Sequence, residues 1–195
     1  MARLYDILKH NDQFIGNKEY EKYQTTKYPN KKMVILTCMD TRLVELLPKA
    51  MDFGHGDAKV IQNAGAILSH PFGSIMRSIL VAIYSLNANE VFVVGHRDCG
   101  MTGLSAEPIL DQAVAAGVTK DKIDVLRHAG IDIDSWLQGF SDVSESVEQS
   151  VSRIRNHPLF PKNVAVHGLI IDPSNGKLDV VVDGYVMIEQ EKHSI

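Results

Sequence analysis

The segment MVILTCMDTR, residues 33–42, decides the fold class of this chain. Its first half, Met33–Thr37, is a short apolar run with β-branched residues, which predicts a strand buried on both faces. Its second half carries a thiol, a carboxylate and a guanidinium directly after that strand. In open α/β sheets, ligands bind beyond the carboxyl ends of the strands. The segment therefore predicts an α/β protein whose chemistry lies at this edge of its sheet.

The same alternation of strand and helix continues along the chain. Strands that alternate with helices pair in parallel through right-handed crossovers. We therefore predict an α/β fold with a mainly parallel four-stranded sheet flanked by helices, an antiparallel edge strand and an N-terminal helical arm. The remaining parallel strands are expected at Ala58–Gln62, Val91–Gly95 and Val164–Ile171, and the edge strand at Leu178–Val182.

Helices are expected between these strands. Residues 43–50 look helical, and Ser69–Leu86 has the strongest helical periodicity, with Pro71 near its start. Asp142 with Glu145 resembles a capping box at the start of a helix that ends before Pro158. Residues 106–140 mix helical pieces with glycines, and their pattern does not resolve the elements.

Residues 1–30 are expected to form the helical arm of a single domain spanning 1–195. The segment is polar and rich in Tyr and Lys, with Leu4, Ile7 and Leu8 at helical spacing. So thin an apolar stripe predicts that the arm packs on another surface, such as a second subunit.

Composition excludes several classes of protein. The chain has 195 residues, a formal charge of −4 and 45% hydrophobic residues, which is ordinary for a globular domain. Net acidity argues against nucleic-acid binding, and no apolar run is long enough to span a membrane. Two cysteines exclude a disulfide-stapled scaffold, and the first ten residues lack the apolar stretch of a signal peptide. We expect a cytoplasmic protein with reduced thiols.

Both cysteines follow predicted strands at the same edge of the sheet. Cys38 follows the first strand, and His96 and Cys99 follow the strand at Val91–Gly95. Two thiolates and an imidazole form a catalytic zinc set that leaves a fourth position for water or substrate. By spacing alone, the thiols could also be small packing residues.

Three short motifs, taken in order, resemble the β-class carbonic anhydrases. They are Cys38-x-Asp40-x-Arg42, Asn63-Ala64-Gly65 and His96-x-x-Cys99. The resemblance extends from about Met33 to the hairpin around Lys177–Val182, and Gly95–Met101 looks most like the compact bacterial branch.

The resemblance implies Zn²⁺ as cofactor and a role for each matching residue. Cys38, His96 and Cys99 match the zinc ligands, and Asp40 and Arg42 match a catalytic carboxylate–guanidinium pair. Zinc-bound hydroxide would attack carbon dioxide, giving bicarbonate and a proton. Asp40 would orient that hydroxide or, as in some relatives, swing onto zinc.

Other interpretations remain open for individual residues. Asp40 could cap the following helix, and Arg42 could be a surface residue. Ala64 and Gly65 are candidates for substrate binding beside the site, although they could simply form a strand-to-helix turn. Asp98 could be an acceptor behind a ligand, but we favour an N-cap of the next helix.

Two rival functions accompany this prediction. A carbonyl sulfide or carbon disulfide hydrolase would use the same zinc site, and a non-catalytic zinc-binding regulatory module would lack turnover. A nucleotide-binding protein is disfavoured because the chain has no phosphate-cradling glycine run. The resemblance also implies a homodimer with its clefts at the subunit interface.

Overall fold

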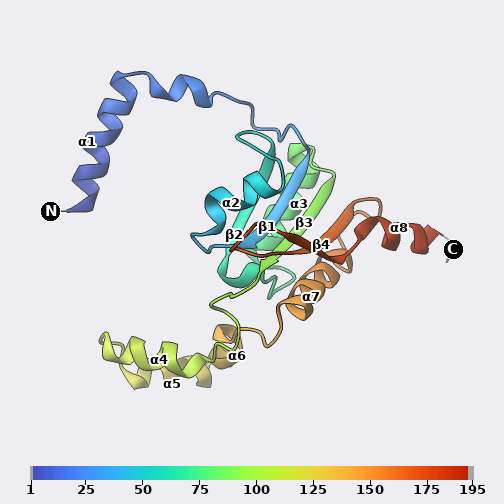
Figure 1. Ribbon diagram of the computed structural model, residues 1–195. Helices are drawn as coiled ribbons and strands as arrows, with labels where there is room; N and C mark the ends of the chain where they lie inside the picture. Colours follow the sequence, from blue (N-terminus) through green and yellow to red (C-terminus); the bar gives the residue numbers. More distant parts are fainter. Residues whose placement is uncertain (1, 193–195) are drawn as a thin grey trace.

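The computed structural model describes residues 2–192, which form one sheet flanked by helices (Figure 1). The strand order within the described residues is β2-β1-β3-β4-β5, with the first four parallel and the last antiparallel to its neighbour. This confirms the predicted fold class. The strands are β1 (Met33–Cys38), β2 (Ala58–Asn63), β3 (Glu90–His96), β4 (Ala165–Ile171) and β5 (Leu178–Val182).

Helices cover both faces of the sheet, and each face has its own hydrophobic core. Helices α3 (Ser74–Leu86) and α7 (Val143–Arg155) share a core with Val34 and Leu36 of β1. Helix α2 (Leu43–Ala50) shares the other core with Ile35, the residue between them. All six residues of β1 are buried, which explains why its sequence is a continuous apolar run rather than an alternating one.

The predicted start of the helix at Ser69 is wrong, because α3 begins at Ser74. The residues before it form a turn: the imidazole of His70 accepts a hydrogen bond from the Phe72 amide, and the His70 carbonyl accepts one from the Gly73 amide. Phe72 is consequently exposed instead of continuing the apolar stripe. By contrast, Asp142 caps α7 as predicted, since its Oδ1 accepts from the Glu145 amide.

Two glycines bring α7 unusually close to the sheet. A Cβ atom at Gly95 of β3 would lie 2.8 Å from Val143 Cγ2, and one at Gly168 of β4 would lie 2.7 Å from Val147 Cγ1. Real Cβ atoms do not approach other atoms so closely, so a larger residue at either position would force the valines or α7 to shift. This contact seats the end of β3, where the next residue is His96, against α7.

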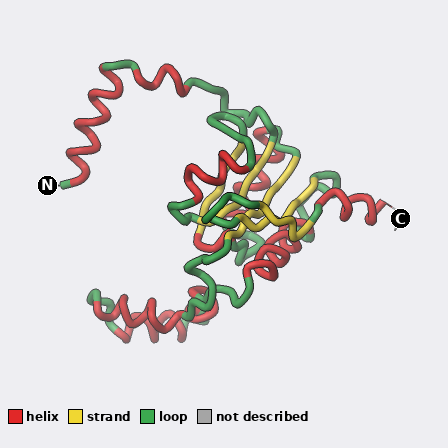
Figure 2. Tube along the Cα trace, in the orientation of Figure 1, coloured by secondary structure: helices red, strands yellow, loops and turns green. Residues whose placement is uncertain are grey.

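The remaining helices lie at the periphery (Figure 1), and Figure 2 shows them joined to the sheet by loops. The predicted arm is helical: α1 (Arg3–Gly16) and the 3-10 helix η1 (Glu19–Tyr23) extend away from the sheet. Among the described residues, no helix combines the length and apolarity that crossing a bilayer would need. The other peripheral helices are α4 (Ala106–Ala115), α5 (Lys120–His128), α6 (Ile133–Leu137) and α8 (Gly184–Lys192). The 3-10 turn η2 (Ala64–Ala66) instead packs next to β1 and β3, with Gly65 and Ala66 buried.

We predict that Gly168→Ala destabilises the fold by about 1–3 kcal/mol, because an added methyl group overpacks the contact with α7. Thermal or urea unfolding measures the change. Gly16→Ala is the matched control, since a Cβ atom there meets nothing within 4 Å and the free energy of unfolding should not fall. Equal stability of Gly168→Ala and the parent chain would contradict the close packing of α7.

Candidate metal centre

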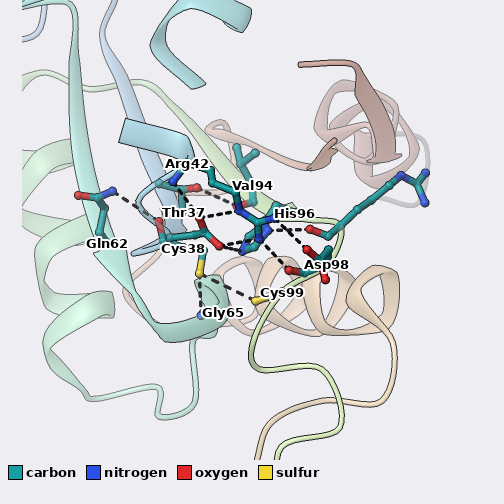
Figure 3. Close-up of polar contacts among 11 residues, drawn as sticks. Thr37, Cys38, Arg42, Gln62, Gly65, Val94, His96, Asp98 and Cys99 are labelled. Atoms are coloured by element: carbon teal, nitrogen blue, oxygen red, sulfur yellow. Dashed lines mark hydrogen bonds and ion pairs between the residues drawn. The ribbon is translucent and has the colours of Figure 1, made fainter. Parts of the chain in front are cut away.

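Parallel pairing of β1 with β3 brings Cys38 and His96 to neighbouring strand ends (Figure 3). Cys99 returns to the same point in the turn after β3, where its carbonyl accepts a hydrogen bond from the Thr102 amide. One donor atom from each of the three side chains lies within 4.8 Å of the others, and the two Sγ atoms are 3.9 Å apart. All three side chains are buried. The structure thus brings together the three predicted ligands.

The imidazole of His96 is held in the orientation that a metal ligand needs. Its Nδ1 lies 2.8 Å from the Arg97 carbonyl oxygen, which can only accept, so Nδ1 carries the proton. In the neutral ring, Nε2 then has a free lone pair. Among the described residues this buried nitrogen has no hydrogen-bond partner. An orphaned buried nitrogen beside two thiols fits a metal ion such as Zn²⁺, for which sulfur and imidazole are the usual ligands.

The two thiols have very different acidities. Burial raises the pKa of Cys38, but the His96 imidazole and the amides of Gly65 and Asp40 outweigh it and bring that pKa to about 7. The Gly65 amide donates directly to Cys38 Sγ over 3.3 Å. Burial raises the pKa of Cys99 to about 11, and neighbouring Cys38 adds to the effect. Near neutral pH, Cys38 therefore loses its proton readily, whereas Cys99 becomes a thiolate mainly when a bound cation stabilises it.

Asp40 and Arg42 form a bidentate ion pair next to these ligands. Arg42 Nε donates to Asp40 Oδ1 over 3.0 Å, and Nη2 donates to Oδ2 over 2.8 Å. These hydrogen bonds lower the pKa of Asp40 to about 2, so the carboxylate is ionised at neutral pH. Its Oδ2 lies 3.8 Å from His96 Nε2. The carboxylate does not cap α2, because the N-cap of that helix is Arg42 and has no side-chain cap bond.

The predicted role of Asp98 as an N-cap is wrong. The next helix, α4, begins only at Ala106, and residues 99–102 form a turn instead. Asp98 has a left-handed backbone, with φ at +53°, and its carboxylate and carbonyl both accept from Arg42. Asp is among the residues that tolerate this conformation, but nothing in the local pattern distinguishes it from a cap.

Ala64 and Gly65 line a cavity of about 550 Å³ together with the three side chains of Cys38, Asp40 and Arg42. Gly65 has φ at +77°, and a Cβ atom there would lie 3.0 Å from Met101. Glycine is therefore needed for the backbone to turn its amide toward the Cys38 thiol. The sequence indicated Gly65 only as a candidate for substrate binding or as a turn residue, and did not reveal this donated hydrogen bond.

The chain is similar to known proteins over most of its length. The family model described as carbonic anhydrase matches residues 33–178. The chain is 60% identical over 185 residues to the Bacillus subtilis protein named "Putative carbonic anhydrase YvdA", covering 95% of this chain and 94% of that one. It is 27% identical to a carbon disulfide hydrolase of Acidithiobacillus thiooxidans, covering 85% of each chain. The structure resembles β-carbonic anhydrase isoform I of Trichomonas vaginalis with a TM-score of 0.86 and 34% identity, covering 95% of this chain and 100% of that one.

We predict that zinc affinity falls steeply on acidification. The ion must displace a proton from Cys99, whose pKa is about 11, and below about pH 7 also from Cys38, whose pKa is about 7. His96 adds a third competing proton at acidic pH, because the neighbouring Cys38 raises the pKa of its imidazole. The affinity should fall about tenfold per pH unit from pH 9 to 7.5 and by at least about a hundredfold per unit below pH 6.5, where the further protons compete. Competition with a chromophoric chelator of known pH dependence measures it.

Cys38→Ser is the matched variant for this titration. It removes one proposed ligand, so it should lose tight zinc binding and flatten the pH dependence. Full zinc content in Cys38→Ser, or an affinity that is constant from about pH 6 to 9, would contradict the ligand assignment.

Proposed function

The chain belongs to the β-carbonic anhydrase family, an enzyme family of lyases, and on that premise we propose that it catalyses the reversible zinc-dependent hydration of carbon dioxide to bicarbonate and a proton. One observation carries the proposal: His96 offers a donor nitrogen within 4.8 Å of two buried thiols, and its Nε2, which has no hydrogen-bond partner among the described residues, lies 3.8 Å from the ionised Asp40 carboxylate.

Cys38, His96 and Cys99 would hold the ion. Zinc in such a site acts as a Lewis acid and supplies hydroxide from water near neutral pH. Three protein ligands leave a fourth position for water or substrate, as in catalytic rather than structural zinc sites. The Gly65 amide and the Nδ1–H bond of His96 keep two of these ligands oriented.

Asp40 would orient the nucleophile. Because its pKa is about 2, the carboxylate remains an acceptor throughout the physiological pH range. Arg42 holds both carboxylate oxygens, which limits the directions from which Asp40 can accept a further hydrogen bond. A water or hydroxide near His96 Nε2 would therefore meet Asp40 in a defined geometry.

The cavity wall suits a small apolar substrate. Met39, Ala64 and Met101 supply apolar surface, while Gly65 and Gly100 add no side chain that would fill the space. We assign Ala64 and Gly65 to substrate binding on this basis. Carbon dioxide carries no charge, so the apolar wall can admit it without a charged partner.

Carbon disulfide or carbonyl sulfide hydrolysis is the second candidate. It is kept because relatives named carbon disulfide hydrolase are 27–28% identical to this chain. Hydration of carbon dioxide is preferred because the 60% identical relative carries a carbonic anhydrase name. The intact Asp40–Arg42 pair argues against a non-catalytic zinc module, which has no use for an oriented carboxylate.

We also propose that the chain is a single domain with an N-terminal arm over residues 1–30, and that two copies of it form a homodimer. Within Arg3–Gly16 of the described chain no residue is buried, and Leu4, Ile7 and Leu8 are each at least half exposed. An isolated helix of this length is marginally stable in water, so it needs a surface to pack on. A second copy of the chain would supply that surface. We propose the cytoplasm as the location of the protein, because Cys38 and Cys99 are free thiols.

We predict that Asp40→Asn retains about one zinc per chain but loses at least a hundredfold in carbon dioxide hydration, because a neutral amide, whose NH₂ group cannot accept from Arg42, replaces the ionised and bidentately held carboxylate. Stopped-flow hydration and metal analysis on the same sample measure both. Asp111→Asn, on the exposed face of α4, is the control and should leave turnover unchanged.

The same stopped-flow samples decide between the substrates. Parallel assays with carbonyl sulfide and carbon disulfide should give far lower kcat/KM values than carbon dioxide. A zinc-loaded parent chain with no hydration at any pH would overturn the proposed function, and faster carbon disulfide turnover would favour the second candidate.

We predict that Leu4→Glu with Leu8→Glu converts the dimer to monomers, because two carboxylates would have to be buried at the arm's contact. Sedimentation velocity at micromolar concentration measures the oligomeric state. Lys9→Glu with Gln13→Glu adds the same groups on the opposite side of the helix and should leave the dimer intact. A monomeric parent chain would overturn the proposal.

A further inference from the structure

Arg42 is held at both ends of its guanidinium. Nε and Nη2 donate to Asp40, as described above. On the far side, Nη1 donates to Asp98 Oδ2 over 2.8 Å, and Nη2 donates a second hydrogen bond to the Asp98 carbonyl oxygen over 2.9 Å (Figure 3). Asp98 therefore binds the half of the guanidinium that Asp40 leaves free.

Asp98 makes these bonds from a left-handed backbone conformation. Its φ is +53°, which non-glycine residues adopt at some cost in free energy. Packing does not hold its side chain there, because the carboxylate is 85% exposed. The left-handed conformation instead allows Asp98 to accept two hydrogen bonds from Arg42.

The position of Arg42 matters because Asp40 lies between two possible partners. One is Arg42 itself, and the other is a cation at the donor atoms of Cys38, His96 and Cys99. Asp40 Oδ2 is already only 3.8 Å from His96 Nε2, so a small rotation would bring the carboxylate onto such an ion. An Arg42 fixed at its far side cannot follow that rotation, so the rotation would break the bidentate pair.

We propose that Asp98 is a positioning residue that fixes Arg42, and thereby keeps the Asp40 carboxylate on the guanidinium and off the metal. The fourth coordination position then stays available to water or substrate. The inference rests on the proposed metal site, but its first test uses the metal-free protein and is independent of activity.

The first test measures how firmly Arg42 is held. Asp98→Gly keeps the left-handed backbone and its carbonyl but removes the carboxylate. In ¹⁵N NMR spectra of the metal-free protein, the Arg42 Nε–H should exchange with solvent about tenfold faster in Asp98→Gly than in the parent chain. Asp98→Asn retains both tolerance of φ > 0 and an oxygen acceptor, so it should restore slow exchange.

Asp52→Gly is the matched control for relief of backbone strain. Asp52 is also left-handed, with φ at +51°, but it pairs with Lys31 and does not bond to Arg42. It should leave Arg42 exchange unchanged. Equal exchange in Asp98→Gly and the parent chain, or an Asp98→Asn variant that behaves like Asp98→Gly, would overturn the proposal.

The second test reads the metal itself, with Co²⁺ in place of zinc and azide as the probe. If Asp40 moves onto the ion in Asp98→Gly, the d–d absorption changes and azide binds about tenfold more weakly. Adding Asp40→Asn removes the competing carboxylate, so the double variant should regain azide affinity.

A Co²⁺ spectrum and azide affinity unchanged in Asp98→Gly, or no recovery in the double variant, would contradict the proposal. A parent chain that binds Co²⁺ and azide but does not hydrate carbon dioxide would overturn only the proposed function.

Discussion

The parallel pairing of β1 with β3 is the constraint on which the rest of this structure depends. The pairing places Thr37 opposite Val94, so both strands leave the sheet at the same level and deliver Cys38 and His96 to one point. The register is firmly held because both faces of β1 are buried, and a shift by one residue would exchange the side chains that face the two cores. Helix α7 seats the same end of β3 through Gly95, where a larger residue would collide with two valines.

The site balances charges that would be costly if buried alone. The low pKa of Cys38 and the high pKa of Cys99 have different origins: hydrogen-bond donors surround the first, whereas burial dominates the second. Asp40 is kept ionised by Arg42, and Arg42 is in turn shared with Asp98. The resulting chain of alternating charges runs from the exposed Asp98 through Arg42 to Asp40, which lies 3.8 Å from the His96 imidazole. The two thiols and the imidazole next to it are a donor set that suits zinc.

The elements that bury many apolar residues are the ones that the sequence pattern predicts clearly. The strands and α7 were predictable because each buries an extended apolar run or stripe. Residues 106–140 were not resolved because the three helices there are short, and each buries a single residue: Ala106, Ile123 and Ile133. A stripe of one residue has no periodicity to detect. The arm was predictable as a helix, although Leu4, Ile7 and Leu8 are exposed and none of the described residues of α1 is buried; Phe14 stacks on Tyr23 of the same arm.

The sequence by itself determined the fold class, the order of the strands along the chain, and the identity of Cys38, His96, Cys99, Asp40 and Arg42 as the candidate site. The fold class and strand order follow from local periodicity, whereas the site residues follow from the resemblance of three short motifs to the β-class carbonic anhydrases, which agrees with the rule that chemistry gathers at carboxyl strand ends. Only the tertiary structure decided that Asp98 faces Arg42, that the Gly65 amide donates to the Cys38 thiol, and that α3 starts late. Asp98 and Gly65 meet partners far away in the sequence and depend on positive φ angles, while the turn before α3 depends on a side-chain acceptor at His70. Such contacts arise only once the chain has folded, so no spacing along the chain encodes them.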